Sequence, residues 1–151
     1  MKYALEISYP QHETRNNQEQ LGEFEASEIL QYFNRMNWKQ LQILQLKMQA
    51  TSTSFTVTNL HTEQSLQIKL NELSAQLSLA FYIHTDISVD VPKHNLFGLI
   101  KFKSKDYVAF HEMSLQSTLN CLTAFLNNDI ECIVKEYQSG HATHFSATSR
   151  A

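Results

Sequence analysis

The fold is decided by residues 95–137, NLFGLIKFKSKDYVAFHEMSLQSTLNCLTAFLNNDIECIVKEY. The apolar spacing of this stretch predicts a strand, a turn, a second strand, a helix and a final strand. Residues 96–103 alternate between the two faces of a strand, Ser104 to Asp106 have turn chemistry, and Tyr107 to Glu112 return as a second strand. These two strands predict a β-hairpin that leads directly into the helix.

The predicted helix has clear signals at both ends. The hydroxyl of Ser114 is expected to accept a hydrogen bond from a first-turn backbone N–H. Asn127 and Asn128 tolerate the left-handed conformation that ends a helix. Residues 130–137 then alternate in polarity and predict the last strand, near the centre of the sheet. The large apolar residues on one side of the helix are Leu115, Leu119, Leu122, Phe125 and Leu126.

The earlier part of the chain predicts more strands and one further helix. Residues 11–22 are polar and predict an exposed loop, and the helix begins at about Glu25 and ends before Trp38. Residues 77–91 predict either one long bent strand or two strands. Period-two alternation predicts strands at Lys2–Tyr9, Thr51–Thr58 and Leu66–Leu70, with residues 59–64 joining the last two as a hairpin.

Residues 39–48 fit two interpretations. Leu41, Leu44 and Met48 have the spacing of a helix, whereas Leu44, Leu46 and Met48 alternate as in a strand. A strand after Gln42 is the favoured prediction. The elements together predict an α+β fold, in which a mostly antiparallel sheet of about 7–9 strands carries two main helices on one face. We expect residues 1–137 to form a single globular domain and residues 138–151 to form a flexible C-terminal tail.

Composition disfavours a nucleic-acid partner. The 151 residues carry a net charge of −3 and a pI near 6.1, so the chain has no general basic field. The acidity is concentrated in residues 13–28, which contain five glutamates and one arginine and have a net charge of −4. Cys121 and Cys132 lack metal-ligand spacing and suit small core residues. No signal peptide or membrane span is predicted, so we expect a cytoplasmic protein with no membrane partner and no cofactor.

No pattern of catalytic residues emerges from the seven histidines. His141 and His144 lie three residues apart but lack a neighbouring carboxylate for a zinc site. His84 and Asp86 share a strand face, whereas the adjacent His111 and Glu112 point to opposite faces. Because no nucleophile motif or phosphate-binding loop accompanies them, the chain is not predicted to be an enzyme and no metal site is expected.

A small basic and aromatic patch surrounds the predicted hairpin. Its lysines suit an edge strand that resists sheet-to-sheet aggregation, and the hairpin is also a candidate docking edge. The residues of this patch are Lys93, Lys101, Phe102, Lys103, Lys105 and Tyr107.

The chain resembles small bacterial immunity proteins of polymorphic-toxin and contact-dependent growth-inhibition systems. The resemblance implies an inhibitor that binds the C-terminal domain of a cognate toxin one to one in the cytoplasm. Since many such toxins are nucleases with basic surfaces, Glu19, Glu23, Glu25 and Glu28 are the candidate partner-binding residues, and Asp86 and Asp90 are a second candidate pair. The segments that carry the resemblance are Phe24–Trp38, Ser54–Val57 with Leu66–Leu70, Leu96–Leu99 and Phe125–Asp129.

The alternative function is a small-ligand-binding domain. The order of elements also resembles the helix-grip arrangement, in which a curved sheet and a late helix enclose a cavity. Two features disfavour it: the late helix is short and is followed by another predicted strand, and Leu77, Leu79 and Phe81 are bulky enough to fill the interior.

Overall fold

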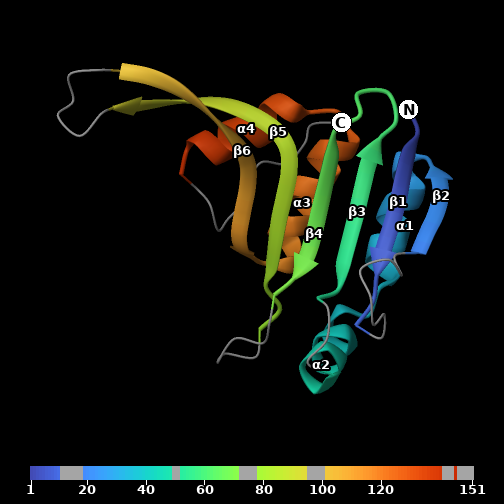
Figure 1. The fold of residues 1–151 in the computed structure, drawn as a ribbon. Helices are drawn as coiled ribbons and strands as arrows, with labels where there is room; N and C mark the ends of the chain where they lie inside the picture. Colours follow the sequence, from blue (N-terminus) through green and yellow to red (C-terminus); the bar gives the residue numbers. More distant parts are fainter. Residues whose placement is uncertain (11–18, 49–51, 72–77, 95–100, 141–144, 146–151) are drawn as a thin grey trace.

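The computed structural model describes the chain except residues 11–18, 49–51, 72–77, 95–100, 141–144 and 146–151 (Figure 1). The described elements, in chain order, are β1 (Tyr3–Ser8), β2 (Glu19–Phe24), α1 (Ala26–Arg35), α2 (Trp38–Met48), β3 (Ser54–Asn59), β4 (Ser65–Leu70), β5 (Phe81–His94), β6 (Lys101–Met113), α3 (Leu115–Leu126) and α4 (Ile130–Gln138).

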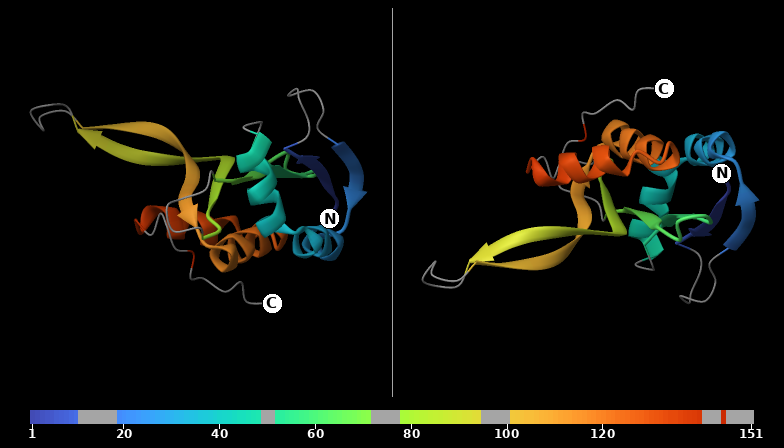
Figure 2. Two further views of the ribbon diagram at one scale, coloured as in Figure 1. Left: turned by 90° about the horizontal axis from the view of Figure 1, so that it is seen from below. Right: turned by 90° about the horizontal axis from the view of Figure 1, so that it is seen from above.

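The six described strands form one antiparallel sheet in the order β2-β1-β3-β4-β5-β6. The α+β class is confirmed, but the described sheet is smaller than the predicted 7–9 strands and the described helices number four instead of two. Helices α1, α3 and α4 cover one face of this sheet, and α2 lies at one end of it (Figures 1 and 2). The opposite face therefore carries no described helix.

Residues 39–48 belong to α2, so the predicted strand after Gln42 is wrong. The helix turns its glutamines inward: the Gln45 amide donates to the Leu70 carbonyl at 3.2 Å and its oxygen accepts from the Thr53 N–H at 2.8 Å. Ile43 and Leu46 face outward, with 46% and 55% of their surfaces exposed. The buried side of the helix combines these glutamines with Trp38 and Leu41, so it is not a continuous apolar stripe. Periodicity therefore did not single out the helix.

Residues 130–137 also form a helix, α4, so the predicted final strand is wrong. Asn128 adopts a φ of 55° and turns the chain, and the Asp129 carboxylate then accepts a hydrogen bond from the Cys132 N–H at 3.3 Å. This is an N-cap, which begins a new helix. Ile130, Ile133, Val134 and Tyr137 pack on the core with helical spacing, and Cys132 is partly buried against it as well.

The predicted turn at Ser104 to Asp106 is wrong as well. Ser104 pairs with Val91 and Asp106 with Val89, inside one long hairpin of β5 and β6. Residues 77–91 were predicted as one strand or two, and the described part from Phe81 onward is a single strand, β5. The pairing of β5 with β6 shifts register between His84 and Ser88, and there the Thr85 hydroxyl donates to the Val108 carbonyl at 2.8 Å. Beyond this shift, β5 and β6 curve away from the other strands (Figure 1). Residues 95–100, which include Leu96–Leu99 of the predicted strand over residues 96–103, lie outside the described residues.

Several other predictions are confirmed. Strand β1, the β3–β4 hairpin and α1 occupy the expected positions, and α3 begins and ends where its caps predicted. The Ser114 hydroxyl accepts from the Ser117 N–H at 3.1 Å, and Asn128 has the expected positive φ. These elements share strong local signals at their ends, which explains why sequence reasoning found them.

The core lies between the sheet and the layer of α1, α3 and α4. The Tyr3 hydroxyl of β1 donates to the Leu126 carbonyl of α3 at 2.7 Å, and the Tyr3 ring lies 6.2 Å from that of Phe125. Phe145, in the segment predicted to be a tail, is buried with its ring 5.8 Å from that of Phe110. At least this residue of the last fourteen therefore packs on the core.

Replacing Leu122 by alanine tests the packing of α3. Leu122 is fully buried, so Leu122→Ala should lower the free energy of unfolding by about 2–5 kcal/mol, measured by urea denaturation. Leu115 lies on the same helix with 40% of its surface exposed, and Leu115→Ala should change stability by less than about 0.5 kcal/mol. Equal effects of the two substitutions would show that α3 packs through another face.

Candidate functional site

Three of the predicted acidic residues gather around one lysine where β2 meets α1. Glu23 lies in β2, Glu25 precedes the first turn of α1, Glu28 lies within that turn, and all three are exposed. The Lys2 Nζ lies 3.0 Å from Glu25 Oε1. We call Glu23, Glu25 and Glu28 the acidic cluster. Three carboxylates outnumber the positive groups beside them, which are the Lys2 ammonium and the α-amino group of Met1, whose charge also lowers the pKa of Glu25.

The charge of Lys2 is influenced by all three carboxylates of the cluster. Its hydrogen bond with Glu25 raises the pKa of Lys2, and the negative charges of Glu25, Glu28 and Glu23 raise it further. The same hydrogen bond and the charge of Lys2 lower the pKa of Glu25. Glu25 is therefore the direct partner of Lys2, and Glu28 and Glu23 act on the same ammonium through charge alone.

The local sequence explains why the cluster forms at this corner. Glu25 has the extended backbone of an N-cap, and its carbonyl accepts from the Glu28 and Ile29 N–H groups at 3.0 and 3.1 Å. Carboxylates are favourable at this end of a helix because the helix dipole is positive there. Since β2 pairs with β1, the start of β1 brings Lys2 beside them.

The other predicted partner-binding residues lie elsewhere. Asp86 and Asp90 are exposed on β5, which is about 19 Å from β2 at the usual spacing between strands. The Asp86 carboxylate accepts from the Ser65 N–H at 2.8 Å, and Asp90 lies directly opposite Lys105. The side chain of Glu19 lies outside the described residues. The six predicted residues therefore do not form one patch.

The face of the sheet opposite the helices carries an aromatic and imidazole group. The ring of Tyr82 lies 4.7 Å from that of His111 and 6.2 Å from that of His84. His84 and Asp86 are both exposed on this face, as the alternation of β5 predicted. Within the described residues, no three His, Cys, Asp or Glu side chains lie close enough to hold a metal ion, and His141 and His144 lie outside them.

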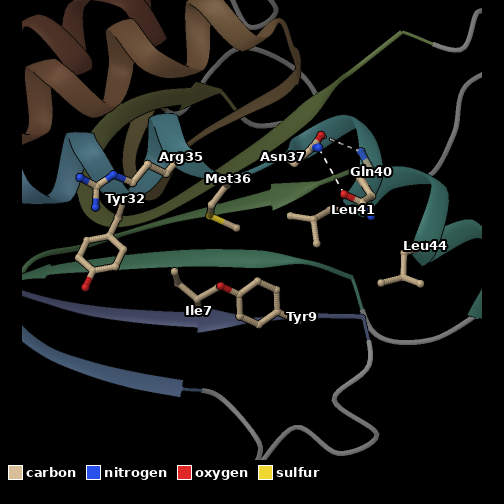
Figure 3. A pocket seen from close by; sticks show the side chains of 9 residues that line it. All are labelled: Ile7, Tyr9, Tyr32, Arg35, Met36, Asn37, Gln40, Leu41 and Leu44. Carbon is tan, nitrogen blue, oxygen red and sulfur yellow. Dashed lines mark hydrogen bonds between the residues drawn. The ribbon is translucent and has the colours of Figure 1, made fainter.

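A pocket of about 450 Å³ opens between β1, α1 and α2 (Figure 3). Most of its lining is apolar, and its amide side chains bond to each other: Asn37 donates to the Gln40 side chain at 3.3 Å. The sequence prediction missed this pocket because its wall exists only when residues 38–48 are helical. The residues that line it are Ile7, Tyr9, Tyr32, Arg35, Met36, Asn37, Gln40, Leu41 and Leu44.

No protein family, curated protein or solved structure matches this chain. None of the helices in the described part of the chain has the length and apolar character needed to cross a membrane.

Removing the ammonium from the cluster should change the titration of Glu25. Lys2→Gln should raise the pKa of Glu25 toward its ordinary value, measured by NMR of the side-chain carboxyl carbon. Because the folded-state pKa is lowered, the stabilisation from this pair is present at neutral pH and is lost as pH falls through that pKa. The control is Lys135→Gln, which removes the exposed Lys135–Glu131 pair of 3.0 Å on α4 and should leave the pKa of Glu25 where it is in the wild type. An unchanged pKa of Glu25 in Lys2→Gln would contradict the described contact.

Proposed function

We propose that this protein is an immunity protein, which binds the C-terminal domain of a cognate bacterial toxin one to one in the cytoplasm and neutralises it. The observation that carries the proposal is the acidic cluster, whose three exposed carboxylates lie at the β2–α1 corner and outnumber the Lys2 ammonium that pairs with one of them. The resemblance of the sequence to small immunity proteins supports the same proposal.

An exposed acidic cluster suits a partner with a basic surface. Complementary charge raises the rate of encounter and fixes the orientation in which two proteins meet. A toxin that acts on nucleic acid needs lysine and arginine residues to contact phosphates. An inhibitor that places carboxylates against those residues blocks the toxin's access to its substrate.

The packing beneath α3 favours this proposal over a helix-grip ligand-binding domain. A helix-grip protein holds its ligand between the curved sheet and the late helix. In this structure that layer contains fully buried side chains, among them Leu122, Phe125 and Phe110. The ring of Phe125 packs on Tyr3 of the sheet, and their separation of 6.2 Å leaves the two rings in contact.

Co-expression tests the proposal directly. The protein, carrying an affinity tag, is co-expressed with the toxin C-terminal domain encoded immediately upstream of its gene. We expect growth to be restored and a one-to-one complex to be recovered. A toxic domain that neither binds the tagged protein nor loses its toxicity would overturn the proposal.

The role of the acidic cluster predicts a change in association kinetics. Replacing Glu23 and Glu28 by glutamine leaves the Lys2–Glu25 pair intact and removes two charges. The association rate with the toxin domain should fall roughly 3- to 10-fold at low salt, and its dependence on salt should weaken. Stopped-flow mixing measures both quantities.

The matched control replaces Glu112 and Glu131 by glutamine. Both residues are exposed, lie outside the acidic cluster, and change the net charge by the same amount. This variant should associate at nearly the wild-type rate. If the two variants associate equally fast, the acidic cluster does not lie at the interface.

A further inference from the structure

The acidic cluster and the pocket adjoin along α1. Glu28, Tyr32 and Arg35 follow one another at i, i+4 and i+7, so they share one side of the helix. From Glu28 to the pocket residue Met36 the helical rise is about 12 Å. The ring of Phe24, which stands between two residues of the cluster in sequence, lies 5.0 Å from the ring of Tyr32 in the pocket wall. A single partner therefore reaches both features within an interface of ordinary size.

The pocket has the composition of a site that receives an apolar group. Ile7, Met36, Leu41 and Leu44 supply aliphatic surface, and Tyr9 and Tyr32 supply ring faces (Figure 3). Its volume lies within the range of pockets that bury small organic groups, so an aromatic side chain fits.

Arg35 is the charged residue among those that line the pocket. Its guanidinium carries five N–H donors and no acceptor, so it pairs with a carbonyl or carboxylate oxygen. An oxygen of that kind accompanies every side chain of a bound polypeptide through the backbone. Tyrosine and arginine are also among the residue types most enriched at the positions that dominate binding energy in protein interfaces.

We infer that this pocket receives an aromatic or large aliphatic side chain of the same basic partner that meets the acidic cluster. The inference rests on the proposed function and deepens it: the cluster attracts and orients the partner, and the pocket holds it. Charge acts mainly on association, whereas burial of an anchor acts mainly on dissociation. The two parts of the interface are therefore separable by kinetics.

Two substitutions on α2 provide a matched test in the complex. Leu44→Asp places a carboxylate in the pocket, whereas Leu46→Asp places the same group two residues away on the other flank of α2, where Leu46 is exposed. Leu44→Asp should raise the dissociation rate from the toxin domain roughly 10-fold or more, with an association rate close to that of Leu46→Asp. Equal dissociation rates for the two variants would overturn the inference.

A second measurement needs no toxin. The 15N-labelled protein is titrated with N-acetyl-tryptophanamide, an aromatic side chain with peptide groups on both sides. We expect saturable shifts of the Tyr9, Tyr32 and Leu41 amides that are lost in Leu44→Asp and kept in Leu46→Asp. Absence of these shifts would overturn the pocket assignment and leave the acidic cluster unaffected.

A parallel titration with decanoate tests whether the pocket binds a small amphiphile instead of an aromatic side chain. Decanoate binding in the same pocket at least tenfold more tightly than the tryptophan amide would assign the pocket to a small amphiphile and overturn the inference. The protein could also bind the tryptophan amide and fail to bind the toxin domain. That result would overturn the proposed function and the partner named here. The preference of the pocket for an aromatic group would stand.

Discussion

The packing of α3 against the inner face of the sheet is the interaction on which the rest of the structure depends. Leu122 and Phe125 bury the helix against the sheet, and the Tyr3 hydroxyl joins the first strand to the end of a helix 123 residues later in the chain. Burial of this kind drives folding, and the hydrogen bond satisfies a carbonyl at the helix end. Because α1 and α4 pack on the same side, no helix in the described part of the chain covers the opposite face of the sheet (Figure 2).

Local signals predicted about half of the elements correctly, and the failures have physical causes. β1 and the β3–β4 hairpin alternate with period two, and Ser114 caps α3. Helix α2 was predicted as a strand because its glutamines anchor neighbouring backbone while Ile43 and Leu46 face solvent. In α4, alternating apolar residues fit both periods, and only the turn at Asn128 distinguishes them.

The candidate site was likewise predicted only in part from the sequence. The acidity of one segment was visible in the sequence, and α1 was predicted correctly, so Glu25 and Glu28 were expected together at its start. That Asp86 and Asp90 lie four strands from β2 depends on the order of strands, which periodicity does not contain. The pocket requires β1, α1 and α2 to meet, and one of these was predicted as the wrong element.

The three residues of the acidic cluster differ in how much the fold depends on them. Glu25 begins α1 and pairs with Lys2, and Glu28 lies in the first turn, where a negative charge stabilises the helix. Glu23 lies on the edge strand β2 and influences Lys2 through charge alone. A substitution at Glu23 therefore disturbs the fold least of the three, because neither the start of a helix nor an ion pair depends on its side chain.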